Sequence, residues 1–365
     1  MKIKNVCMGI LTVILLVSLP PDQMPVRAGG IVIFAQDKLS AAPAAGESRP
    51  AGREKETPKP PEQPVSGPGG TNYSHSGVME NVYGEGDDQY WIFEPMSPTL
   101  KSAPLIVFNH GWGGMNPKIY GAWIEHLVKK GNIVVFPRYQ ADLQTQPKLF
   151  IPNAINAIKD AIKRLQGEGH ISPELDRFGM VGHSMGGIIT ANIAALAKSE
   201  RLPEPKAIMI VQPGATTVIE LAELSKISSS TLMLNVVGDN DRVVGDNDAK
   251  KILEESTLIP AENKNLVIVV SDYYGKPALV ANHFSPIGFS GSPRHSPNVN
   301  ALDYYAYWKL FDALTNCAFY GKDSEYALGN TSQQRYMGKW SDGTPVKELV
   351  VIDQLKSKSE KQGGK

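Results

Sequence analysis

Short runs of β-branched residues alternate with helical patterns through most of the chain, and this alternation constrains the fold more than any other feature. Runs such as Ile133-Val134-Val135 and Leu266–Val270 are apolar at every position, as expected of strands covered on both faces. The pattern predicts an α/β fold, with a mostly parallel central sheet of about eight strands and helices on both of its faces. The predicted strands are Gln89–Pro95, Pro104–Asn109, Ile133–Pro137, Phe178–Gly182, Ala207–Gln212, Thr231–Val237 and Leu266–Ser271.

Amphipathic segments between and after these strands predict helices, because apolar residues recur at spacings of three and four. The predicted helices are Lys118–Lys130, Ile151–Leu165, Gly187–Lys198 and Ala301–Phe319. The third of these carries no charge before its last residue, so we expect it to be buried.

The N-terminus has a different character from the rest of the chain. Lys2 and Lys4 precede an apolar run over residues 6–19. As a helix this run would be about 21 Å long, which is shorter than a hydrocarbon core of about 30 Å. We therefore expect a signal peptide over residues 1–28, cleaved after residue 28 or residue 35, and export to the periplasm, the cell exterior or the cell surface. An uncleaved membrane anchor is the alternative; once the signal is cleaved, no stable membrane span is expected.

A proline-rich stretch over residues 36–72 contains few large apolar residues, so it predicts a disordered linker. Residues 353–365 form a polar, lysine-rich tail. Residues 73–352 are left as one α/β domain.

Charge and cysteine content exclude several kinds of function. Lys plus Arg and Asp plus Glu each number 37, so the formal net charge is zero at pH 7. Such a chain has no basic field to attract nucleic acid, and we expect no nucleic-acid partner. Cys7 and Cys317 are too few for a disulfide framework or a thiolate metal site, and Cys7 lies in the predicted signal peptide.

A strand–turn–helix unit carries the first chemical signal. Gly182–Gly186 reads G-H-S-M-G, directly after a predicted strand and before a predicted helix. In a G-x-S-x-G turn the glycines remove side chains that would clash, and the serine hydroxyl is exposed on a strained backbone. Ser184 is therefore the candidate nucleophile.

A second glycine-rich turn, His110–Gly114, reads H-G-W-G-G and directly follows the strand that ends at Asn109. Glycines here let backbone N–H groups turn toward the carbonyl oxygen of a substrate. We expect the backbone N–H groups of Trp112 and Met185 to form an oxyanion hole. A plain glycine turn with a core tryptophan is the alternative for this motif taken alone.

An aspartate-rich loop follows the strand Thr231–Val237, at the edge of the sheet where open α/β sheets place their sites. Asp241 is the candidate acid, Asp239 is the alternative, and we expect Asp246 and Asp248 to lie on the surface. Several carboxylates in one loop also suggest calcium, but the spacing is not that of an EF-hand. No metal is therefore included in the predicted site.

The candidate general base lies in a loop after the strand Leu266–Ser271. His283 is the best placed histidine, and His295 is its competitor a few residues further on. With Ser184 and Asp241, His283 would complete a nucleophile–base–acid triad, which needs no cofactor.

The order Ser184, Asp241, His283 resembles that of the α/β-hydrolase superfamily over residues 73–352. Within it, H-G-W-G-G, G-H-S-M-G-G and Asn282-His283-Phe284 are similar to motifs of dienelactone-hydrolase-like and cutinase-like serine esterases. Dienelactone hydrolase itself has a cysteine where this chain has Ser184, and cutinase-like enzymes usually carry disulfides that this chain cannot make. Residues 337–343 match neither group.

The resemblance implies a secreted serine hydrolase that cleaves small-molecule or polymeric carboxylic esters through an acyl-enzyme intermediate, without a cofactor. The spacing of the triad leaves no room for a large lid domain, which favours an open substrate cleft. Tyr139, Phe150 and Phe284 are the candidates to line it, and core packing is the equal alternative for Tyr139 and Phe150. A peptidase, thioesterase or acyltransferase with the same triad is an alternative, and so is a non-catalytic binding module. The acyl-chain length and the oligomeric state stay open.

Overall fold

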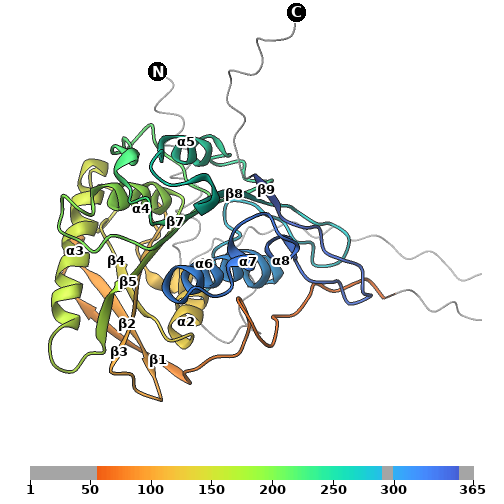
Figure 1. The fold of residues 1–365 in the computed structure, drawn as a ribbon, viewed down its shortest axis with the longest axis horizontal. Helices are drawn as coiled ribbons and strands as arrows, with labels where there is room; N and C mark the ends of the chain where they lie inside the picture. The colour runs from red at the N-terminus through yellow and green to blue at the C-terminus, as the bar shows by residue number, and fades with distance from the viewer. Residues whose placement is uncertain (1–55, 290–298, 353–365) are drawn as a thin grey trace, which may run out of the picture. The chain divides into compact units, whose positions relative to one another are not determined.

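One mixed β-sheet organises the computed structural model, which describes residues 56–289 and 299–352 (Figure 1). The described residues from Pro58 onward belong to one structural unit. The predicted signal peptide over residues 1–28, the first part of the predicted linker, His295 and the tail over residues 353–365 lie outside the described residues.

Nine strands make up this sheet within the described residues. In spatial order they are β1 (Gly77–Tyr83), β2 (Tyr90–Met96), β4 (Ile133–Pro137), β3 (Ser102–Asn109), β5 (Ser172–His183), β6 (Ala207–Val211), β7 (Leu232–Gly238), β8 (Lys264–Val269) and β9 (Val350–Ile352). The strands from β4 to β8 in this order are parallel, whereas β1, β2 and β9 pair antiparallel at the edges. The predicted fold class is confirmed.

The predicted strands are all present, with shifts of a few residues at their ends. Strands β1 and β9 were not predicted, because edge strands need no continuous apolar run. Met79 and Val82 of β1 are 37% and 52% exposed, so this strand lacks the buried pattern that identifies the central strands.

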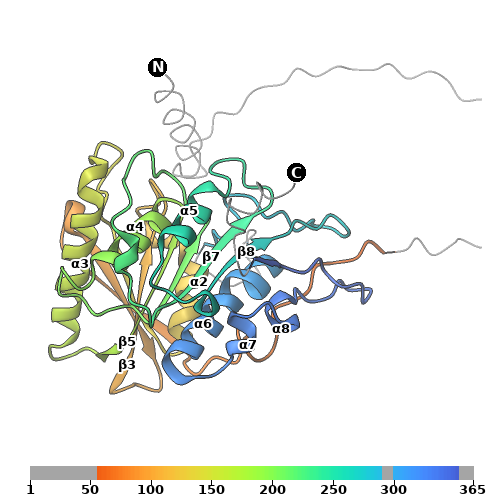
Figure 2. The same cartoon turned by 45° about the horizontal axis from the view of Figure 1, so that its top comes forward.

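Helices cover both faces of the sheet, as predicted (Figure 2). One face carries α2 (Gly121–Lys129) and α6 (Trp308–Tyr320), and the other carries α3 (Phe150–Leu165), α4 (Met185–Leu196) and α5 (Asn247–Glu255). The shorter helical segments are η2 (Gly86–Asp88), η3 (Pro117–Tyr120), η4 (Pro147–Leu149), η5 (Leu224–Lys226), η6 (Ala261–Asn263), η7 (Asp303–Tyr307), α7 (Ser324–Ala327) and α8 (Ser332–Arg335). None of the helices in the described part of the chain has the length and apolar character needed to cross a bilayer.

The central strands supply two cores because successive side chains point to opposite faces. Leu234 and Val236 of β7 pack with α2 and α6, whereas Met233 and Val237 pack with α3, α4 and α5. A sheet covered in this way presents its carboxyl edge as the place where polar loops can converge.

The prediction of a disordered linker is wrong for residues 58–72, which pack against the rest of the domain. The N–H of Lys276 donates to the carbonyl of Pro58 (2.9 Å), and the N–H of Ser341 donates to the carbonyl of Lys59 (3.0 Å). The partners are supplied by segments far away in sequence, so the local composition could not indicate them. Proline also reduces the entropy that ordering such a segment costs.

The same contacts account for residues 337–343, which matched no expected pattern. Trp340 is 1% exposed, and its indole N–H donates to Oδ2 of Asp272 at 3.1 Å. Gly338 adopts φ +84°, and a Cβ there would lie 2.9 Å from Pro61. This segment therefore fixes the proline-rich N-terminal stretch to the loop that follows β8.

Candidate active site

The turn between β5 and α4 places Ser184 at the carboxyl edge of the sheet. Ser184 adopts φ 56° and ψ −121°, a strained conformation for a residue with a side chain. A Cβ on Gly182 would overlap the carbonyl of Gly186, and one on Gly186 would overlap the carbonyl of Asn109. Both glycines of the motif are thus required by close backbone approach, which is the physical reason anticipated from the sequence.

Ser184, His283 and Asp241 form a continuous hydrogen-bonded row. His283 Nε2 lies 3.0 Å from Ser184 Oγ, and His283 Nδ1 lies 2.8 Å from Asp241 Oδ2. The side chain of Asp241 is fully buried and that of His283 is 6% exposed. The structure therefore brings together the three side chains that the sequence nominated, in the geometry of a nucleophile, a base and an acid.

The environment of Asp241 keeps its carboxyl group ionised. Burial alone would raise its pKa, but the hydrogen bond and charge of His283 lower it below the ordinary value. Oδ1 also accepts hydrogen bonds from the N–H groups of Val243 (2.9 Å) and Val244 (3.1 Å). An ionised Asp241 favours the proton of His283 on Nδ1 and leaves Nε2 free to accept a proton.

The other carboxylates of this loop serve different partners. Asp239 accepts hydrogen bonds from the N–H (3.0 Å) and hydroxyl (2.5 Å) of Ser271, so the alternative acid ties β7 to β8 instead of facing the histidine. Asp248 accepts from Thr216, and Asp246 pairs with a lysine. Within residues 56–289 and 299–352, no three His, Cys, Asp or Glu side chains converge as metal ligands.

The turn expected to hold an oxyanion lies beside the serine. The N–H of Gly114 donates to the carbonyl of Gly111 (2.9 Å), and Gly113 adopts φ +76°, as the third residue of a type II turn requires. Trp112 occupies the second position of this turn. Met185 begins α4, where the helix dipole favours negative charge. Both residues thus lie on the segments expected to supply oxyanion donors.

Comparison with known proteins agrees with this architecture. A protein family described as the alpha/beta hydrolase fold matches residues 106–243, which is less than half of the chain but includes Ser184 and Asp241. The chain has the α/β-hydrolase fold. The resemblance predicted from the sequence is thereby confirmed at the level of the fold. No curated protein matches the chain.

Among solved structures, the chain is similar to one from a study of two esterases of the fungus Rhizomucor miehei and their substrate specificity. The identity is 17% and the TM-score is 0.43, over 55% of this chain and 76% of that chain. The dienelactone-hydrolase-like and cutinase-like labels stay predictions.

The aromatic residues expected to line the cleft have different positions. Tyr139 and Phe150 are both fully buried, so the prediction that they contact substrate is wrong. Phe150 packs edge-to-face against Trp112, with ring centroids 5.7 Å apart, so it supports the turn that contains Trp112. Phe284 is half-buried, and its ring lies 5.4 Å from that of His283. Among the three, only Phe284 reaches the surface beside the triad.

Two buried glutamines support the site, and the sequence analysis did not nominate either of them. Gln140 Oε1 accepts from the N–H of Gly113 (2.9 Å), and Gln212 Nε2 donates to the carbonyl of Asn282 (2.9 Å). Each glutamine lies within three residues of the end of a parallel strand, so a polar residue at that edge was the available signal.

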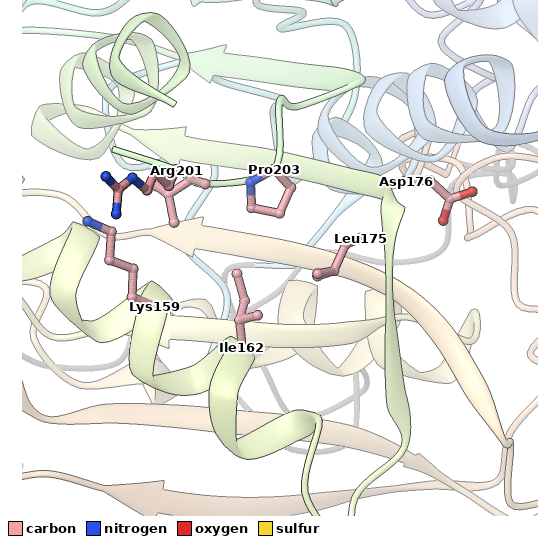
Figure 3. Close-up of a pocket in the computed structure, with 7 residues that line it drawn as sticks. Lys159, Ile162, Leu175, Asp176, Arg201 and Pro203 are labelled. Atoms are coloured by element: carbon pink, nitrogen blue, oxygen red, sulfur yellow. The ribbon is translucent and has the colours of Figure 1, made fainter. Parts of the chain in front are cut away.

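A separate hollow lies at the other end of β5 (Figure 3). Its volume is about 610 Å³, and it is lined by Lys159, Ile162, Leu175, Asp176, Arg201, Leu202 and Pro203. Leu175 and Asp176 belong to the first half of β5, whereas Ser184 directly follows its last residue. This hollow is therefore distinct from the candidate active site.

Proposed function

We propose that this protein is a serine hydrolase that cleaves carboxylic esters through an acyl-enzyme intermediate. The observation that carries the proposal is the hydrogen-bonded row from Ser184 Oγ through His283 to Asp241, on an elbow that only glycines allow. The α/β-hydrolase fold supports hydrolysis in general, and the substrate class is inferred from the chemistry of this site.

Each residue has a role in the proposed mechanism. Ser184 Oγ attacks the ester carbonyl carbon while His283 Nε2 takes the hydroxyl proton, and Asp241 stabilises the imidazolium that results. The backbone N–H groups of Trp112 and Met185 receive the oxyanion of the tetrahedral intermediate. His283 then returns the proton to the departing alcohol, which leaves the acyl group on Ser184. Water activated by the same histidine hydrolyses this acyl-enzyme.

The absence of a large inserted segment between the triad elements favours accessible substrates. Asp241 lies three residues after the end of β7, and the chain between Ser184 and His283 consists of α4, β6, η5, β7, α5, η6, β8 and the loops that join them. We infer an open cleft that takes esters of short or medium acyl chains, or the accessible ends of polymers, with Phe284 at its rim. We also propose, from the predicted signal peptide, that the chain is exported.

Hydrolysis of nitrophenyl esters from acetyl to palmitoyl tests the proposal, with the full chain and its Ser184→Ala variant measured side by side. We expect turnover with short acyl chains in the native protein and none above background in the variant. Equal turnover in both proteins would contradict the acyl-enzyme route. Cleavage of peptides or thioesters without cleavage of any oxygen ester would contradict the proposed substrate class.

A further inference from the structure

Two buried side chains, Tyr120 and His183, lie between the oxyanion turn and the backbone of the candidate base. The N–H of Gly111 contacts the hydroxyl of Tyr120 at 2.9 Å, and that hydroxyl contacts Nδ1 of His183 at 2.9 Å. His183 Nε2 lies 2.8 Å from the carbonyl oxygen of His283. Tyr120 is 1% exposed and His183 is 2% exposed, so water does not compete for these contacts.

The two backbone groups at the ends fix the direction of every hydrogen bond. The carbonyl of His283 can only accept, so His183 must carry its proton on Nε2. Burial, followed by the proximity of His283, lowers the pKa of His183 to about 3, so the ring is neutral and Nδ1 is an acceptor. The hydroxyl of Tyr120 therefore donates to Nδ1 and accepts from the N–H of Gly111. Donors and acceptors match throughout, with one arrangement of protons.

The chain of contacts joins two parts of the site that the sheet does not join directly. Gly111 precedes Trp112 in the oxyanion turn, and His283 lies on the loop after β8. A Cβ on Gly111 would lie 3.3 Å from the Cβ of Ser184 and 3.4 Å from His183 Nδ1. The turn, the nucleophile and His183 are thus in close contact, and a small shift of one would move the others.

We propose that Tyr120 and His183 are positioning residues, which set the distance between the oxyanion donors and the base while the tetrahedral intermediate forms. This inference rests on the proposed function. Neither side chain is placed to touch the substrate. Tyr120 acts through the N–H of Gly111, the neighbour of the oxyanion donor Trp112, and His183 acts through the carbonyl of His283. The proposal predicts a loss in the chemical step and little change in substrate affinity, because transition states tolerate misplacement less than ground states do.

The first test is Tyr120→Phe, which removes one oxygen atom and keeps the ring. We expect kcat for a short nitrophenyl ester to fall about 10- to 100-fold, with KM within about two-fold of the native value. Tyr305→Phe is the matched control, because the hydroxyl of Tyr305 also hydrogen-bonds to a backbone group, the carbonyl of Glu62 at 3.1 Å, away from the triad. This control should leave kcat and KM unchanged.

The second test replaces His183. A glutamine at position 183 offers an N–H donor and a carbonyl acceptor in place of the two ring nitrogens, whereas leucine offers neither. We expect His183→Gln to retain most of the native kcat and His183→Leu to lose at least as much as Tyr120→Phe. Thermal unfolding of each variant identifies any activity that is lost through unfolding.

The outcomes separate this inference from the proposed function. An active native enzyme with an unchanged kcat in Tyr120→Phe would overturn the positioning role and leave the ester hydrolase intact. A rise in KM without a fall in kcat, or equal losses in His183→Gln and His183→Leu at equal thermal stability, would also overturn it. A native protein that neither hydrolyses esters nor reacts with a fluorophosphonate at Ser184 would overturn both.

Discussion

Replacing Asp241 with asparagine alters the candidate triad at one atom, and the structure decides which way the new amide must face. Oδ1 of Asp241 accepts hydrogen bonds from the N–H groups of Val243 (2.9 Å) and Val244 (3.1 Å), and Oδ2 lies 2.8 Å from His283 Nδ1. In Asp241→Asn the amide oxygen must stay with the two backbone donors. The NH₂ group therefore takes the place of Oδ2 and points at the imidazole.

That amide group forces the wrong tautomer on the base. It donates to Nδ1 of His283, so the proton of the neutral ring moves to Nε2, which faces Ser184. In this state His283 cannot accept the hydroxyl proton. The same exchange in a serine-protease triad lowers kcat about 10⁴-fold, which corresponds to about 5.5 kcal/mol in the barrier. We expect a fall of this order here.

The assay is kcat for nitrophenyl acetate in the native protein, in Asp241→Asn and in Asp246→Asn. Asp246 lies in the same loop, and its partly exposed carboxylate pairs with Lys250 at 2.6 Å. The same chemical exchange there should leave kcat within about two-fold, because exposed ion pairs contribute little. An Asp241→Asn variant that folds and retains more than about a tenth of the native kcat would refute the assigned role of Asp241.

Two further predictions concern the elbow and the loop after β8. Gly186→Ala places a Cβ against the carbonyl oxygen of Asn109, a backbone atom that cannot move aside. We therefore expect a loss of about 3 kcal/mol in the free energy of unfolding, together with loss of turnover. A native free energy of unfolding and native turnover would contradict this. Burial alone would raise the pKa of Asp272, but hydrogen bonds from Lys347 N–H and Trp340 Nε1–H lower it below the ordinary value. Its contribution to stability is therefore complete above the unfolded pKa of about 3.9 and is lost as the pH falls through the folded value. Denaturant unfolding of Asp272→Asn should show a deficit of about 1–3 kcal/mol at pH 7 that shrinks toward pH 3, and a deficit independent of pH would contradict the ionised assignment.

The central sheet could be predicted from the sequence because buried parallel strands leave a local record. In Ile133–Pro137 the side chains on both faces of the strand are apolar, and this run identifies β4 without any knowledge of its partners. Strand β9 leaves no such record. Within the described residues it covers three positions and pairs with β8, and 47% of Val350 is exposed.

The proline-rich stretch and residues 337–343 could not be interpreted locally, because each is ordered by the other and by the loop after β8. Trp340 and the carbonyl of Pro58 both lie against Gly275, and Gly338 lies against Pro61, so these contacts span most of the chain. The composition of a segment indicates only whether that segment can form a core by itself, and neither of these two segments forms one.

The candidate site likewise contains residues that a local sequence pattern marks and residues that no local pattern marks. The glycine pattern around Ser184 is dictated by the turn itself, so the nucleophile could be placed from the sequence alone. The hydrogen bonds from Tyr120 and His183 cross 63 and 100 residues of chain, and no local pattern marks either residue. Tyr139 and Phe150 come after β4, whose carboxyl end lies at the edge of the sheet that carries the site. Their positions in the sequence did not reveal that both side chains are buried in the core.

Reaction with a fluorophosphonate tests the central claim most directly, because this reagent forms a covalent bond with a serine that an adjacent base has activated. The full chain and its Ser184→Ala variant would be treated together, and the site of the mass increase would be mapped by peptide mass spectrometry. The account predicts one phosphonylated residue, Ser184, in the native protein and no adduct in the variant. An unmodified Ser184 in the folded native protein, or the same adduct in both proteins, would contradict it.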